Sequence, residues 1–154
     1  MKKLLLIIII LPFVFSCNGQ DKSSLKSLSD GSLQLENFDF KTRISTLLPE
    51  DTKSKEYAGY YQVKSEMLEV DTVSDGEFIG SEKPVRIEYR QRSFSTRDIM
   101  ANFDDFDFNA VNLVTSMDGK LMLVNAVAAE TDKVKTEDFV SKLRKKYGNS
   151  KKTK

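Results

Sequence analysis

Two runs of alternating side chains that meet at Asp118-Gly119 constrain the fold more than any other feature of the sequence. They lie in FDFNAVNLVTSMDGKLMLVNAVAAE, residues 106–130. Alternation of apolar and polar residues is typical of a strand with one buried face, and glycine accepts the positive φ that a tight hairpin turn requires. The sequence therefore predicts an antiparallel β-hairpin that turns at Asp118-Gly119.

Three further segments predict strands. In PVRIEYR, residues 84–90, apolar side chains alternate with charged ones. Residues 33–40 show two period-2 pairs with an irregularity near Asn37, and the β-prone residues of 56–70 favour a strand over a helix. Residues 71–84 hold two glycines and a proline, which is typical of a turn-rich connector.

Helical spacing is seen twice. Ile44, Leu47 and Leu48 carry it until Pro49 ends it. The segment 136–148 predicts a longer helix, with Thr136 as its cap, Glu137 and Asp138 near its positive end and Gly148 past its last turn. One face of this helix is apolar and must pack on something; its residues are Phe139, Val140, Leu143 and Tyr147. We therefore expect an α+β fold, a small antiparallel sheet with a C-terminal helix packed on it, in a single domain of residues 33–148.

Composition excludes several classes of site. Histidine and tryptophan are absent, and Cys17 is the only cysteine. Structural disulfides, Cys/His zinc sites, haem ligation by histidine and Ser-His-Asp catalysis are thereby excluded. The charges nearly balance, with 24 Lys or Arg against 23 Asp or Glu, whereas nucleic-acid binders carry a basic face. We expect no nucleic-acid partner, no cofactor and no metal.

The first 17 residues predict a targeting signal. Lys2 and Lys3 precede an apolar run, residues 4–15, that is shorter than the ~20 residues of a membrane span and matches the core of a secretory signal. The run ends in Val14-Phe15-Ser16-Cys17. This motif resembles the lipobox of bacterial lipoproteins. An ordinary secretory leader with an incidental cysteine is the alternative.

The resemblance has specific consequences. It implies cleavage between Ser16 and Cys17, which removes residues 1–16, then a diacylglyceryl group and a further acyl chain, typically palmitate, on Cys17. Asn18 follows the cysteine where an Asp would signal retention in the inner membrane. The resemblance thus implies an outer-membrane lipoprotein, similar in its CNGQDKSS segment to those of the Bacteroidota, and we expect it to face the periplasm.

Both ends of the mature chain differ in composition from its middle. Residues 17–32 are rich in serine and hold two leucines as their only large apolar residues, so they predict a flexible tether behind the lipidated cysteine. Residues 149–154 form a basic tail. From residue 133 to 154 there are nine Lys or Arg against two acids. These cations suit either contact with anionic headgroups or solubility and compensation of a helix dipole.

An acidic motif, FDDFDFN at residues 103–109, is the candidate site. If it is a strand, Asp105, Asp107 and Asn109 lie on one side of it, with Phe106 and Phe108 on the other. The D-x-D-x-N spacing also matches the start of a calcium loop, but Ala110 and Ser116 stand where that loop needs Gly and Glu. We predict a solvated strand face, with Asp104, Asp105 and Asp107 as contacts for a partner or an ion.

A tyrosine group, Tyr57, Tyr60 and Tyr61, suits either a sugar or protein contact or packing at the core and sheet edge. If residues 60–63 form a strand, Tyr60 and Tyr61 face opposite ways.

The sequence shows no nucleophile paired with a base, no ligand cluster and no glycine-rich phosphate loop. We therefore expect a non-catalytic domain that binds or scaffolds an unknown envelope protein. Two alternatives remain open at this point: a membrane-tethered immunity or inhibitor protein against a toxin or hydrolase, and a carboxylate-based hydrolase.

Overall fold

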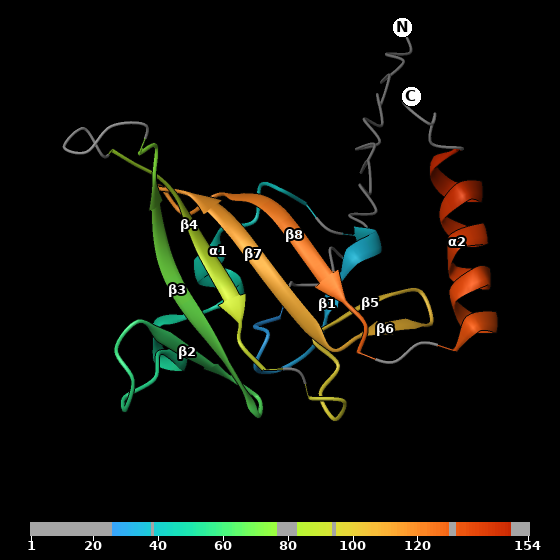
Figure 1. Ribbon diagram of the computed structural model, residues 1–154, viewed down its shortest axis with the longest axis horizontal. Helices are drawn as coiled ribbons and strands as arrows, with labels where there is room; N and C mark the ends of the chain where they lie inside the picture. The colour runs from blue at the N-terminus through green and yellow to red at the C-terminus, as the bar shows by residue number, and fades with distance from the viewer. Residues whose placement is uncertain (1–25, 38, 77–82, 94, 130–131, 149–154) are drawn as a thin grey trace, which may run out of the picture.

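A computed structural model describes residues 26–148, apart from residues 38, 77–82, 94 and 130–131. The predicted leader, Cys17, the first part of the tether and the basic tail of residues 149–154 lie outside the described residues. The described chain forms two β-sheets, two α-helices and two short 3-10 turns (Figure 1).

The larger sheet has five strands in the order β2-β3-β4-β7-β8, each antiparallel to its neighbour. They are β2 (Tyr60–Val63), β3 (Glu66–Ser74), β4 (Pro84–Gln91), β7 (Ala110–Ser116) and β8 (Leu121–Val127). The smaller sheet has the order β1-β5-β6 and consists of β1 (Leu33–Gln34), β5 (Ala101–Phe103) and β6 (Phe106–Phe108). Its β1 and β5 are parallel, the one departure from the antiparallel pairing that we predicted.

The predicted hairpin is confirmed. Strands β7 and β8 pair with Leu113 opposite Val124, and Gly119 in the turn has φ +80°. The Ser116 hydroxyl donates to Asp118 at 2.5 Å, and Lys120 Nζ lies 3.0 Å from the same carboxylate. These contacts, the hydroxyl first, lower the pKa of Asp118 to about 2. The Asp at this turn is therefore ionised and fixed in place.

The strand predicted over residues 33–40 is wrong beyond Gln34, because residues Leu35–Asn37 form a 3-10 turn, η1. Leu33 and Gln34 pair with β5, after which Leu35 packs against the core. The chain reaches α1, Ile44–Leu47, where the sequence predicts a helix. A second 3-10 turn, η2 (Glu50–Thr52), lies within the loop that follows it.

The strand predicted over residues 56–70 is two strands, β2 and β3, joined by a tight turn. Lys64 in this turn has φ 53°. The carboxylate of Asp98 accepts from the Ser65 amide at 2.9 Å and from its hydroxyl at 2.5 Å. A residue far along the chain thus holds the turn, which explains why no local signal predicts it. Strand β3 continues to Ser74, into the segment predicted to be a connector.

The buried position of Leu28 shows that the domain begins before residue 33, the predicted boundary. Leu28 is 1% exposed and belongs to the core, and its amide donates to the Leu47 carbonyl at 2.9 Å. The segment from residue 26 to 32, assigned to the tether by its serine content, is therefore part of the domain. The largest fully buried apolar side chains of the described chain are Leu28, Leu47, Val63, Leu68, Met100, Val111 and Leu113.

The C-terminal helix, α2, spans Lys133–Tyr147 and starts three residues before the predicted cap. The Asp132 side chain accepts from the Val134 amide at 2.8 Å, so Asp132 is the cap. The Thr136 hydroxyl instead donates to the Asp132 carbonyl, and Glu137 and Asp138 lie beyond the first turn. The C-terminal end is as predicted, since Gly148 follows with φ +79°.

Helix α2 packs on the smaller sheet through aromatic rings. The Phe139 ring stacks on Phe106 with centroids 4.3 Å apart and meets Phe103 and Phe108 edge-on. Leu143 packs beside it, yet no residue of α2 is buried. The predicted α+β fold with a C-terminal helix packed on a sheet is thus confirmed. In the described part of the chain no helix combines the length and apolar character of a membrane span.

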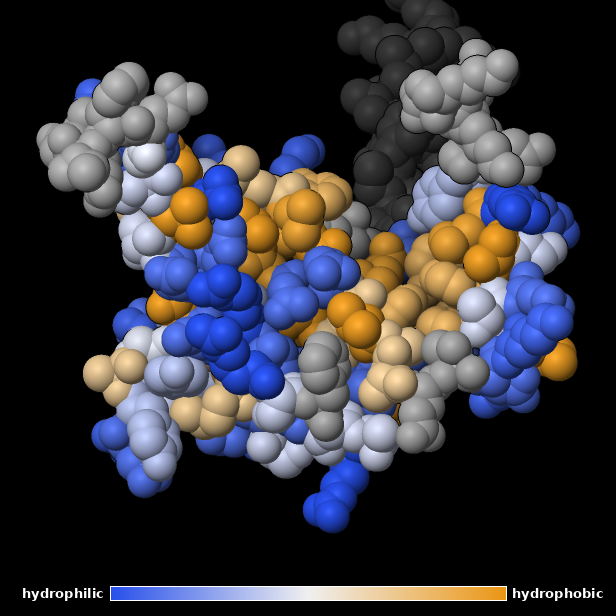
Figure 2. Space-filling view, in the orientation of Figure 1, coloured by the Kyte–Doolittle hydropathy of each residue, from blue (hydrophilic) through white to orange (hydrophobic). Residues whose placement is uncertain are grey.

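The outer face of the larger sheet is divided into two parts. Over β3 and β4, carboxylates and guanidinium groups alternate, as in the ion pair of Asp71 with Arg90 at 2.6 Å and that of Glu88 with Arg86 at 2.8 Å. Figure 2 shows this hydrophilic stripe, with apolar side chains gathered over β7 and β8 beside it. Met122 and Leu123 of β8 are exposed apolar residues.

Candidate functional site: an acidic hollow between β6 and α2

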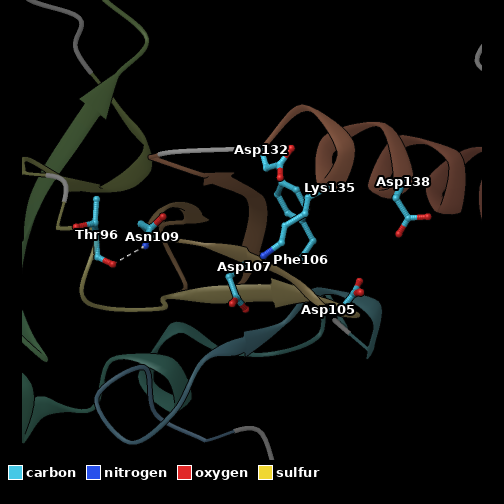
Figure 3. Close-up of a pocket in the computed structure, with 8 residues that line it drawn as sticks. All are labelled: Thr96, Asp105, Phe106, Asp107, Asn109, Asp132, Lys135 and Asp138. Carbon is cyan, nitrogen blue, oxygen red and sulfur yellow. Dashed lines mark hydrogen bonds between the residues drawn. The ribbon is translucent and has the colours of Figure 1, made fainter.

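A hollow of about 730 Å³ lies between β6 and the first half of α2. Figure 3 shows Asp107 projecting from β6 and Lys135 extending towards it from α2. We call this site the acidic hollow, and its lining residues are Thr96, Asp105, Phe106, Asp107, Asn109, Asp132, Lys135 and Asp138. Four carboxylates and one ammonium group therefore line this site.

The alternation of side chains along β6 determines the direction of the Asp107 carboxylate. Phe108 is 8% exposed and Phe106 packs on Phe139, so the intervening Asp107 is directed to solvent. Asp138 lies in α2 and Asp132 caps the start of this helix, which the same aromatic contacts bring against β6. The hollow thus depends on the packing of two segments that lie about 25 residues apart in the sequence.

Lys142 gathers three carboxylates at one end of the acidic hollow. Its Nζ lies 2.7 Å from Asp105, 3.1 Å from Asp104 and 3.1 Å from Asp138. The hydrogen bond from Lys142 lowers the pKa of Asp105, and the three carboxylates, Asp105 foremost, raise the pKa of Lys142. An ammonium group thus occupies the position where these oxygens would otherwise meet a cation.

Asn109 joins the two sheets and shapes the other end of the acidic hollow. Its side-chain amide donates to the carbonyls of Thr96 and Asp98 at 3.4 and 3.3 Å, and its side-chain oxygen accepts from the Ala129 amide at 3.1 Å. Its backbone amide donates to Val127 at 3.0 Å. All these groups are engaged by the protein itself, so Asn109 positions the loops around the site.

The predicted strand face over residues 103–109 is wrong in its geometry. Asp104 has φ 54° and, with Asp105, forms the turn between β5 and β6, so only Asp107 projects from a strand. Asp105 contacts Lys142, whereas Asn109 bonds to backbone groups elsewhere. The D-x-D-x-N residues therefore do not converge on a point, and the described residues include no group of three or more acidic side chains placed to hold a metal ion.

Of the predicted contact residues, Asp105 and Asp107 line the acidic hollow, while Asp104 contributes only to the Lys142 cluster. Asp132, Lys135 and Asp138 complete the site, and the sequence analysis missed them as site residues. Their proximity to β6 follows from the stacking of Phe106 on Phe139, a long-range contact without a local signal.

Hydrogen bonds favour the ionised form of three described carboxylates, those of Asp98, Asp105 and Asp118. The pKa shifts of Asp98, Asp105 and Asp118 are all downward, caused chiefly by hydrogen bonds from Ser65, Lys142 and Ser116 respectively. A general acid in a carboxylate hydrolase needs the opposite shift, a raised pKa that keeps its proton near neutral pH. The site is chemically suited to attract cationic groups.

The tyrosine group is split between core and surface. Tyr61 is buried, with its ring 6.0 Å from Tyr89, while Tyr60 lies on the other face of β2, next to Tyr57 at 6.3 Å. The prediction that Tyr60 and Tyr61 face opposite ways is confirmed. A second hollow, of about 360 Å³, lies beside them and is lined partly by Lys53 and Gly59.

No protein-family model, curated protein sequence or solved structure matches the chain. The geometry of the described residues and the leader motif therefore carry the functional argument.

Proposed function

We propose that the protein is an outer-membrane lipoprotein, anchored through acylated Cys17 and facing the periplasm, whose domain binds an envelope partner without catalysis of its own. The leader motif supports the anchor. The observation that carries the binding function is the acidic hollow, which four aspartates and Lys135 line. Asp105 and Asp138 share Lys142, while Asp107 forms no ion pair among the described residues and is exposed in the hollow. The partner that fits this site presents lysine or arginine side chains.

The position of Leu28 supports close attachment to the membrane. Eleven residue steps separate Cys17 from this first core residue, and a fully extended chain of that length spans about 40 Å at most. An acylated Cys17 therefore keeps the domain near the headgroups. Two or more acyl chains hold a protein stably at a bilayer, whereas one does so only marginally.

The Lys142 cluster bears on the immunity or inhibitor alternative. A substrate-mimicking acidic face needs several free carboxylates, but Asp104 and Asp105 already share Lys142. Asp107 projects into the acidic hollow away from that cluster. The observations thus favour recognition of a basic partner segment inside the hollow over display of the 104–107 face as a whole.

Crosslinking in intact envelopes tests the binding proposal. Asp107→Lys reverses a charge in the hollow and leaves the Lys142 cluster in place. Asp51→Lys is a matched control, because Asp51 is also exposed and forms no ion pair among the described residues. We expect the wild type and Asp51→Lys to yield the same crosslinked complex and Asp107→Lys to lose it. A complex that persists in Asp107→Lys would exclude the hollow as the binding site.

A further inference from the structure

The last turn of α2 carries cations that the described carboxylates do not neutralise. Arg144 and Lys145 are exposed and form no ion pair with any described residue, and Lys146 lies 3.5 Å from Glu36. Earlier in the helix carboxylates lie close to the cations, since Lys133 pairs with Glu137 at 3.9 Å, Lys142 pairs with three aspartates, and Lys135 lines the acidic hollow beside four aspartates. Uncompensated positive charge is therefore concentrated at the C-terminal end of α2.

The helix dipole offsets only part of this charge. The C-terminal end of a helix is equivalent to roughly half a negative charge, which is less than the charge of Arg144 and Lys145, the two cations of the last turn without an ion pair among the described residues. The sequence remains basic to its last residue, because seven Lys or Arg and no Asp or Glu follow Asp138. Compensation of the dipole therefore does not account for the basic end.

An exposed aromatic residue lies among these cations. Tyr147 is 64% exposed, its ring centroid lies 6.3 Å from that of Phe103, and Lys146 Nζ lies 5.6 Å from it. Tyrosine combines an apolar ring with a polar tip and is enriched where proteins meet the membrane interface. The end of α2 thus combines two features that suit a headgroup layer.

The rest of the chain has the opposite charge. Residues 18–132 carry 13 Lys or Arg and 21 Asp or Glu, a net charge of −8, whereas residues 133–154 carry a net charge of +7. An anionic surface attracts one end of such a molecule and repels the remainder, which orients it. Figure 1 shows α2 at the opposite edge of the molecule from β2 and β3.

We propose that the C-terminal end of α2, with Arg144, Lys145 and Tyr147 as its contact residues, docks on an anionic bilayer surface through phosphate-bearing headgroups. The acidic hollow lies along the first half of the same helix. Its lining residues there run from Asp132 to Asp138, which lie thirteen and seven residue steps before Lys145, about 20 and 10 Å along the axis. Docking therefore holds the hollow away from the bilayer, open to a partner. This inference goes beyond the proposed function, and its test does not depend on acylation of Cys17.

Cosedimentation with vesicles tests the docking surface. The test uses residues 18–154, the predicted mature chain without its acylated cysteine, which contains every buried side chain described above. Vesicles of equal parts phosphatidylglycerol and phosphatidylcholine are compared with phosphatidylcholine alone, at low salt and in about 1 M salt, where screening is nearly complete. We expect binding to the anionic vesicles at low salt alone.

Charge reversal at the helix end makes the test specific. At about 1 kcal/mol per cation near an anionic surface, Arg144→Glu with Lys145→Glu should weaken vesicle binding about thirtyfold or more. Lys55→Glu with Lys83→Glu is the matched control, since both residues are exposed and lie outside α2. We expect this control to bind nearly as well as the wild type. If the helix-end variant melts earlier, the neutral pair Arg144→Gln and Lys145→Gln replaces it.

Three results would overturn the docking surface. These are equal binding to both kinds of vesicle, wild-type binding by the helix-end variants, and equal losses in the helix-end and control variants, which would indicate a response to net charge alone. Failure of Cys17 to carry lipid would overturn the anchor and leave this result unaffected, so the two proposals fail separately.

Discussion

Strand β7 and helix α2 are held in the domain by different means. Strand β7 has seven residues, of which Ala110, Val111, Leu113 and Thr115 are buried, whereas α2 has fifteen residues and none is buried. The strand lies between β4 and β8. The helix contacts the smaller sheet on one side only, through the rings of Phe139 and Tyr147 and through the ion pairs of Lys142 in the β5–β6 turn. Burial thus fixes the sheet, while α2 should open at a lower free energy.

A change in the core should have the largest effect. Leu113 is fully buried in β7, so Leu113→Ala removes apolar contacts and leaves a cavity. We expect the free energy of unfolding to fall by about 2–5 kcal/mol, with sheet and helix unfolding together. Urea unfolding followed by circular dichroism measures this loss. A loss below about 1 kcal/mol would show that β7 is not the centre of the fold.

The matched change in α2 should cost less and act locally. Phe139→Ala removes the ring that stacks on Phe106, but this ring is only partly buried. We expect a loss of about 1–2 kcal/mol. Hydrogen exchange should show faster exchange in α2 and unchanged protection in β7. Val134→Ala is the control, since Val134 is 70% exposed and should change neither. Loss of protection in β7 to the same extent would indicate that helix and sheet form one cooperative unit.

The smallest effect concerns pH. Because the hydrogen bond from Lys142 lowers the pKa of Asp105 below its ordinary 3.8, the folded state favours the ionised carboxylate. Its contribution to stability is therefore full above that ordinary value and is lost as the pH falls through the lower pKa of the folded state. We expect Asp105→Asn to melt slightly earlier than the wild type near neutral pH, with the difference vanishing in strong acid. A difference that grows towards low pH would have the wrong sign for this contact.

The same contrast explains what the sequence could predict. The β7–β8 hairpin depends on the alternation of its side chains and on Gly119 in the turn, and the C-terminal end of α2 depends on Gly148. Because these features are local, both elements were predicted correctly. The start of α2 was misplaced because Thr136 resembles a cap, although Asp132 performs that role. The serine-rich composition around Leu28 did not predict that this residue belongs to the core and that its amide bonds to the Leu47 carbonyl.

The candidate site was predicted only in part for a related reason. Asp105 and Asp107 are adjacent to two phenylalanines in the sequence and were identified from that motif. Asp132, Lys135 and Asp138 join them because Phe139 packs on β6, and such a contact between distant segments has no signature in either segment. Predictions from local pattern therefore identified two of the four carboxylates that line the acidic hollow.

The central claim, that the domain is a lipid-anchored envelope protein, depends on one atom, the sulfur of Cys17. Metabolic labelling with a clickable fatty acid tests it directly in the wild type and in Cys17→Ala, which removes the only thiol of the chain. We predict strong labelling of the wild type in the outer-membrane fraction and none of Cys17→Ala. Equal labelling of the two proteins, or an unlabelled wild type, would contradict the claim.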